Sequence, residues 1–138
     1  MSCAMPGLVP GLNRMRPAVR IEAMALPIRQ AIDRAGALGA RAVQFEARGD
    51  LTPGNLSGTG RRELASLARS RQLEIAAVAC GLRRGLAHPE DLEKRMEHVR
   101  QVIGLAADLG TNRVVLEAGP VGDPKSEDCS RLSGLLVD

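Results

Sequence analysis

A ten-residue segment of this chain occurs twice, and each copy has the form of a helix end, a glycine and a short strand. Residues 38–47 are followed 71 residues later by residues 109–118, and the copies align without a gap at Leu, Gly, Val, Glu and Ala. This spacing fits two successive βα units of about 35 residues each. The repeat therefore predicts a parallel α/β protein in which strands alternate with helices.

Both copies of the repeat end in Glu-Ala, and a third Glu-Ala closes the apolar run of residues 19–23. The carboxyl ends of parallel strands meet at one edge of a sheet, where α/β folds place their chemistry. A carboxylate there can bind a divalent metal, accept a hydrogen bond from a sugar hydroxyl or pair with arginine. An arginine on the loop after the third strand can bind substrate oxygens. The sequence thus predicts four substrate-binding residues, which are Glu22, Glu46, Arg83 and Glu117. Salt bridges at the rim are the alternative role for each of them, and no catalytic residue is identified.

Apolar periodicity and helix-capping residues predict four strands and four helices after an N-terminal leader. Residues 1–17 are rich in Pro, Gly and Met and are predicted to be disordered, which leaves residues 18–138 as one domain. The strands are predicted at residues 18–23, 41–46, 73–80 and 113–117. The helices are predicted to begin at Pro27, at Ser57 or Thr59, at His88-Pro89, and at Arg131. The third helix is predicted to bury one stripe: Leu92, Met96, Val99, Ile103 and Ala106.

Polar residues within the strands favour a barrel over an open sheet. Arg20 and Glu22 alternate with apolar residues in the first strand, as Gln44 and Glu46 do in the second. Strands covered by helices on both faces are almost continuously apolar, whereas a barrel carries its helices outside only. A complete barrel needs at least about 200 residues. The predicted fold is α/β: a partial (β/α)8 TIM barrel of about four parallel βα units, ending in a truncated helix. Edge strands of an open sheet are the alternative.

Composition argues against several functions. The net charge of +3 comes from scattered arginines, and Phe45 is the single aromatic residue, so a base-stacking platform for nucleic acid is missing. The sequence has no apolar run of membrane-spanning length, and its three widely spaced cysteines suit reduced thiols, so we expect no membrane association and a cytoplasmic location. Phosphate-binding glycine motifs and paired metal-binding histidines are absent. His88 and His98 are interpreted as a helix cap and a surface residue, and Cys80 as a small buried hydrophobe.

One segment of the sequence resembles a known family. The runs GDLTP at residues 49–53 and LSGTGRREL at residues 56–64 resemble the segment between the second strand and second helix of xylose isomerase-like TIM barrels. They are most similar to bacterial proteins described as sugar phosphate isomerases/epimerases. The runs LRRGL at residues 82–86 and RVV at residues 113–115 fit the same template. The resemblance covers roughly residues 17–121.

The resemblance implies an eight-stranded barrel that acts on a small sugar-type ligand with a divalent metal. In the family, carboxylates and His or Gln from the second half hold that metal. This chain corresponds to the N-terminal half only, so we expect no metal on this chain alone and no isomerase activity. The apurinic-endonuclease branch is disfavoured, because Cys80-Gly81 and Glu117-Ala118 stand where that branch has metal-binding histidines.

The half barrel has two interpretations. The change in sequence after Val121 indicates a shortened or frame-altered gene product, with a genuinely half-sized protein as the alternative. A half barrel leaves two sheet edges and an inner face uncovered, which favours association. The chain is therefore also predicted to be a non-catalytic half barrel that self-associates, as a homo-oligomer, or pairs with a separate second half.

Overall fold

The computed structural model describes residues 16–137. Strands alternate with helices along this part of the chain, as predicted. The strands are β1 (Ala18–Arg20), β2 (Ala42–Glu46), β3 (Glu74–Cys80) and β4 (Val114–Leu116). The helices are α1 (Ile28–Ala37), α2 (Gly58–Ser70), α3 (Leu92–Asp108) and α4 (Glu127–Val137), with short 3-10 turns η2 (Ile21–Met24) and η3 (Gly49–Leu51). Of the leader predicted for residues 1–17, only Arg16 and Pro17 lie within the described residues, and neither has regular structure.

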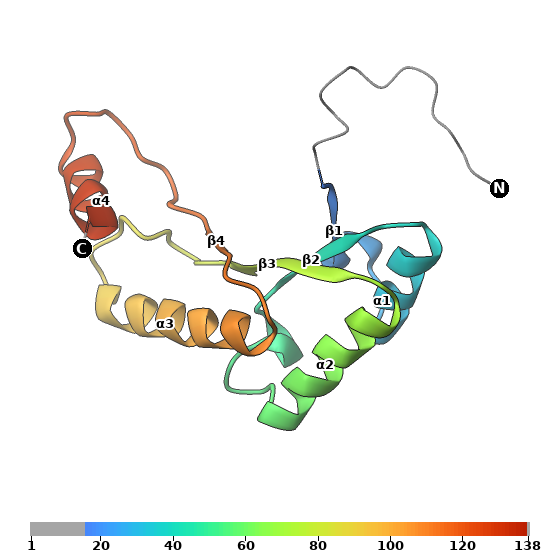
Figure 1. Ribbon diagram of the computed structural model, residues 1–138. Coiled ribbons are helices and arrows are strands. Elements are labelled where there is room, and N and C mark those ends of the chain that lie inside the picture. Colours follow the sequence, from blue (N-terminus) through green and yellow to red (C-terminus); the bar gives the residue numbers. More distant parts are fainter. Residues whose placement is uncertain (1–15, 138) are drawn as a thin grey trace, which may run out of the picture.

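The four strands form one sheet in sequence order, and each neighbouring pair is parallel. Figure 1 shows α1, α2 and α3 on one face of this sheet, while none of the described helices packs on the other face. Right-handed crossovers that advance by one strand each time place every helix on the same face. A doubly wound sheet reverses its strand order and covers both faces. The predicted partial TIM barrel is therefore confirmed.

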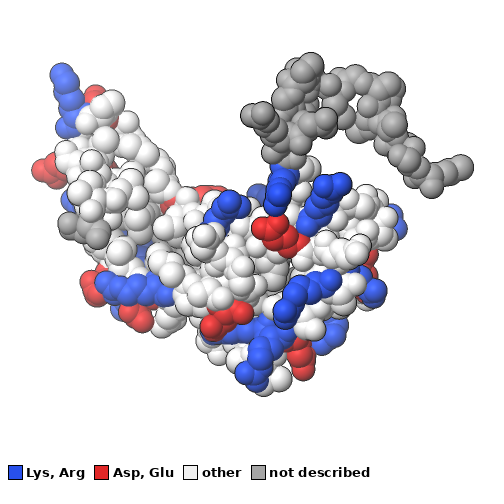
Figure 2. Space-filling model, in the orientation of Figure 1, with Lys and Arg blue, Asp and Glu red and all other residues white. Residues whose placement is uncertain are grey.

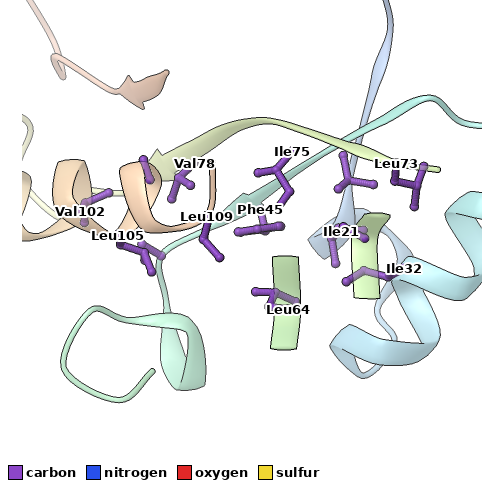
Figure 3. Packing of buried hydrophobic residues seen from close by; sticks show 14 of the residues in the cluster. Ile21, Ile32, Phe45, Leu64, Leu73, Ile75, Val78, Val102, Leu105 and Leu109 are labelled. Atoms are coloured by element: carbon purple, nitrogen blue, oxygen red, sulfur yellow. The ribbon is translucent and has the colours of Figure 1, made fainter. Parts of the chain in front are cut away.

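The helix-covered face of the sheet carries the core. Phe45 of β2 is 1% exposed and lies between the sheet and Leu64 of α2, with Leu105 and Leu109 beside it (Figure 3). Complete burial of such a side chain stabilises the fold by about 1.5–3 kcal/mol. Alternate residues of the strands point to the other face, where Glu46 is only half-buried. The prediction of one apolar and one polar face thus holds for β2.

The first strand is shorter than predicted, because the chain leaves the sheet after Arg20. Ile21 turns into η2 and enters the core, where it is 3% exposed. The turn closes with a hydrogen bond from the Ala25 amide to the Glu22 carbonyl. Glu22 therefore lies on a turn after the strand and not within it. Its place at the carboxyl end of β1 is unchanged.

The third helix begins at Leu92 and not at His88-Pro89. Asp91, the residue before it, has a left-handed backbone with φ of 55°. The His88 ring nitrogen accepts a hydrogen bond from the Glu90 amide, so this histidine caps a turn of the loop and not the helix. The guanidinium of Arg95 donates to the carbonyl oxygens of His88 and Glu90. These contacts satisfy the loop backbone without helical hydrogen bonds.

The buried stripe of α3 is rotated from the predicted one. Val102 and Leu105 are buried, whereas Ile103 is 52% exposed. Val99 and Ala106 were predicted correctly as core residues. Periodicity alone did not separate the two stripes, because apolar residues occur on both sides of this helix.

The last helix begins four residues earlier than predicted, at Glu127. The hydroxyl of Ser126 accepts the Cys129 amide, which is the usual contact of an N-cap serine. Leu132 of α4 packs on Leu86 and Ala87, in a small cluster apart from the main core. The helix therefore lies on the loop that follows β3 and not along the outside of β4.

One arginine holds the long loop after β2 against two helices. Arg61 of α2 donates to the carbonyl oxygens of Leu56 and Pro53, at 3.0 and 2.8 Å. Its third contact is an ion pair of 2.6 Å with Asp108 at the end of α3. The side chain is 18% exposed, so these hydrogen bonds are largely shielded from water.

We expect Arg61→Ala to lower the free energy of unfolding by about 2 kcal/mol, because it leaves two shielded carbonyl oxygens and a carboxylate without their donor. Among the described residues, the neighbouring Arg62 makes a side-chain hydrogen bond only to the exposed Thr59 hydroxyl. Arg62→Ala is therefore the matched control and should cost less than about 0.5 kcal/mol. Urea denaturation followed by circular dichroism measures both. Equal losses for the two variants would contradict the role given to Arg61.

Candidate functional site

The carboxyl ends of three neighbouring strands surround a cavity of about 360 Å³. Because the strands are parallel, the residues that follow them meet at this edge of the sheet. Glu46 ends β2, Arg83 lies on the loop after β3, and Glu117 follows β4 directly. The lining residues are Glu46, Ala47, Arg48, Gly81, Leu82, Arg83 and Glu117. Three of the four predicted site residues thus share one cavity.

The fourth predicted residue, Glu22, is not among the residues that line this cavity. Its carboxylate accepts a hydrogen bond from the backbone amide of Glu46. The contact joins the turn after β1 to the last residue of β2 and holds Glu46 in position. Glu22 therefore lies at the same end of the sheet as the other carboxylates but contacts the backbone. Its predicted role in substrate binding stays a prediction.

Glycine at position 81 makes room for the Glu46 carboxylate. A Cβ atom placed on Gly81 would lie 2.4 Å from Oε1 of Glu46, far inside van der Waals contact. The carboxylate consequently extends across the end of β3 at a point where any side chain would displace it. The sequence shows a glycine directly after the strand, but the strand register needed to connect it with Glu46 is visible only in the fold.

The arginines near the cavity differ in their contacts. Arg84 is not among the lining residues and pairs with Glu90. Arg48 and Arg83 line the cavity and are exposed. Two guanidinium groups and two carboxylates therefore surround the space. Carboxylates accept hydrogen bonds from hydroxyl groups, and guanidinium groups donate to carbonyl, hydroxyl or phosphate oxygens.

Cys80, the last residue of β3, is 1% exposed and belongs to the main core. Burial raises the pKa of its thiol, and the negative charge of the nearby Glu46 raises that pKa further. A thiol with a raised pKa is protonated at neutral pH and is a poor nucleophile. The interpretation of Cys80 as a small buried hydrophobe agrees with this environment.

The loops after β3 and β4 touch through two glycines. Gly85 and Gly119 both have left-handed backbones, with φ of 69° and 83°. A Cβ atom on Gly85 would lie 2.4 Å from the Ala118 carbonyl oxygen, and the Leu86 amide donates to that same oxygen at 3.0 Å. The two loops therefore form one continuous side of the rim.

Metal-binding donors do not gather in the described part of the chain. Among residues 16–137, no three His, Cys, Asp or Glu side chains lie close enough together to hold a metal ion. His88 belongs to the loop before α3, and His98 lies within α3 and is half-buried. The carboxylates Glu46 and Glu117 thus lack a third donor of this kind within the described residues.

The face of the molecule seen in Figure 2 carries charges of both signs. Figure 2 shows Lys and Arg interspersed with Asp and Glu on the visible face, and several arginines are held in ion pairs, such as those of Arg29, Arg71 and Arg100. Within residues 16–137, none of the helices combines the length and the apolar character that crossing a membrane requires.

These observations define half of a (β/α)8 barrel with a polar cavity at the carboxyl ends of its strands. The model of the family "Xylose isomerase-like TIM barrel" matches residues 14–133. The chain belongs to this family, as the resemblance of its sequence predicted. A search of curated proteins found no match.

The structure is similar to the crystal structure of a xylose isomerase domain protein from Planctomyces limnophilus. The TM-score is 0.68 at 16% sequence identity, and the match covers 86% of this chain. It covers 45% of the Planctomyces chain, so this chain spans about half the length of that protein. At this identity the likeness concerns the fold alone.

We expect Gly85→Ala to destabilise the fold by about 3 kcal/mol. The left-handed backbone costs an alanine about 1–2 kcal/mol, and the new Cβ forces two backbone segments apart. Gly54→Ala is the control, because nothing lies within 4 Å of its Cβ position, and its effect should be below about 0.5 kcal/mol. Thermal and urea unfolding measure both. A Gly85→Ala variant as stable as the parent would disprove the loop contact.

The raised pKa of Cys80 predicts a loss of stability at alkaline pH. The unfolded thiol ionises near its ordinary pKa of about 8.5, whereas the folded thiol stays protonated to higher pH. Its contribution is therefore complete below about pH 8.5 and is lost as pH rises towards the folded pKa. Glu46→Gln should reduce this loss without removing it, because burial is the larger cause. Urea unfolding of the parent and of Cys80→Ala between pH 7 and 10 tests the prediction. The prediction fails if the stability of these two proteins depends on pH in the same way.

Proposed function

We propose that the cavity at the carboxyl ends of β2, β3 and β4 binds a small, oxygen-rich ligand of the sugar or sugar phosphate class. The observation that carries this proposal is the convergence of Glu46, Arg83 and Glu117, from three different strand ends, on one space. Residues so far apart in sequence meet there only because the strands are parallel and in sequence order.

The chemistry of the cavity matches such a ligand. Glu46 and Glu117 can each accept hydrogen bonds from vicinal hydroxyl groups, and Arg83 can donate two parallel hydrogen bonds to a phosphate or to neighbouring hydroxyl oxygens. Arg48 adds a second positive charge at the rim. The volume of about 360 Å³ lies at the lower end of the range for small-molecule sites, roughly 300–1,000 Å³.

The reaction class that we propose for the barrel to which this half belongs is isomerisation or epimerisation. Such a reaction moves a proton at a carbon next to a carbonyl, and in the family the resemblance implies assistance by a divalent metal. The described residues supply no set of three donors for that metal, so we assign them ligand binding and no step through a metal. We propose that the 138-residue chain binds the ligand without converting it.

We expect weak binding, because the cavity offers only a few charge-assisted hydrogen bonds and is open to water. A dissociation constant in the millimolar range corresponds to about 4 kcal/mol. In NMR titrations with fructose 6-phosphate and fructose, the amides of Gly81 and Ala118 should shift. Arg83→Gln should weaken the binding of fructose 6-phosphate about tenfold and the binding of fructose less, because only the phosphate ester carries a formal negative charge. Glu46→Gln should weaken both ligands.

The matched controls are Arg62→Gln and Glu63→Gln, which make the same chemical changes on α2. Both should bind as the parent does. Equal losses in site and control variants would show a non-specific charge effect. If neither ligand shifts the amides that border the cavity, the binding proposal is wrong.

The activity of the isolated chain is tested separately. Ketose and ketose phosphate are incubated with the purified chain and Mg²⁺, Mn²⁺ or Co²⁺, and the products are resolved by NMR. We expect no conversion above that of the metal ions alone. Metal-dependent epimerisation or isomerisation that disappears in Glu46→Gln would overturn the proposal that this half binds without turnover.

A further inference from the structure

Within residues 16–137, β1 and β4 are the two edges of the sheet, and no further strand pairs with either of them. The Val78 amide donates to the Arg113 carbonyl, so the alternate residue, Val114, presents its own amide and carbonyl to the open side of β4. An open edge of this kind is a template for another strand. Four strands in sequence order are half of the eight that close a barrel.

The two edges carry opposite charges at the carboxyl ends of their strands. Arg20 is the last residue of β1 and is in register with Gln44 of β2, which alternates with the core residues Val43 and Phe45. Arg20 therefore belongs to the face that bears no helix. Glu117 follows β4 and alternates with Leu116, which packs against the core. Both charged residues are exposed. Each thus lies on the inner side of the carboxyl end of an edge strand.

The outer side of β4 is only partly covered in the described part of the chain. A groove of about 900 Å³ runs beside this strand and α3, and its lining includes Val99, Ile103 and Val114. Ile103 is 52% exposed, and Val115 on the inner face is 45% exposed. Large apolar side chains left open on both sides of one edge strand indicate that a further element packs there.

We propose that two copies of this chain close an eight-stranded barrel, with β4 of each copy pairing in parallel with β1 of the other and Arg20 contacting Glu117 of the second copy. Each copy uses both edges, so the contact closes after two copies and leaves no strand unpaired. Opposite charges on the two edges fix which strands meet. The four strand ends of the second copy then complete the rim around the cavity.

The occupant of the open edges is inferred to be a second copy because one chain carries both complementary edges. A separate second half needs no complementarity between β1 and β4 of this chain, since each edge then meets a different sequence. The proposal depends on the sheet and its edges and not on the ligand. Its failure therefore leaves the binding proposal standing, and the reverse also holds.

Sedimentation equilibrium of the purified chain, from micromolar to hundreds of micromolar, tests the assembly. We expect a monomer–dimer equilibrium. Arg20→Glu places like charges at both junctions of the dimer, and Glu117→Arg does the same. If the like charges weaken the association about tenfold at each of the two junctions, the dissociation constant of the dimer rises about 100-fold. Arg62→Glu, an equal change of charge on α2, should leave the dimer unchanged.

Mixing the two variants is the decisive measurement. A dimer of one Arg20→Glu copy and one Glu117→Arg copy has opposite charges at both junctions. The mixture should therefore dimerise with a dissociation constant within about tenfold of the parent's, although neither variant does so alone. Circular dichroism checks that each variant is folded. If one is not, the double variant Arg20→Glu with Glu117→Arg is measured instead, because its own two edges again carry opposite charges. A monomer at every concentration, larger open assemblies, or a mixture no tighter than its components would each overturn the proposal.

Discussion

Burial of one face of the sheet beneath three helices is the constraint on which the rest of the structure depends. Phe45, Val78 and Leu105 belong to the core that joins the sheet to its helices, and such burial is the main favourable term in folding. Because every crossover has the same hand and direction, the helices occupy that face only. The opposite face is therefore free to carry Gln44 and Glu46, which a sheet covered on both sides would exclude.

The polar rim follows from this one-sided packing. Glu46 points to the uncovered face at the last position of β2, and two backbone features hold it there. Its amide donates to Glu22, and its carboxylate extends across Gly81. Arg83 and Glu117 approach the same space from the next two strand ends. A ligand site can arise here without cost to the core, because the core lies on the other side of the strands.

The repeat in the sequence predicted the fold class, the end of β2 at Glu46 and the end of β4 to within one residue of Glu117, because strand endings and glycine stops are local signals. Three features could not be predicted in this way. The turn of Ile21 into the core, the exposure of Ile103 and the contact of Glu22 with the Glu46 amide all depend on which elements become neighbours. Apolar residues on both sides of α3 satisfied two helical stripes equally well, and only packing on β3 selected one of them.

The contact between Gly85 and Gly119 has a consequence for how the rim can change. Since the backbones of the two loops touch, with no side chain between them, neither loop can alter its course alone. Arg131 of α4 donates to the Ala87 carbonyl of the first loop, which ties the last helix to the same unit. Grafting a different loop after β3 or β4 would therefore require exchanging both loops together with α4, as one interchangeable module of the barrel mouth.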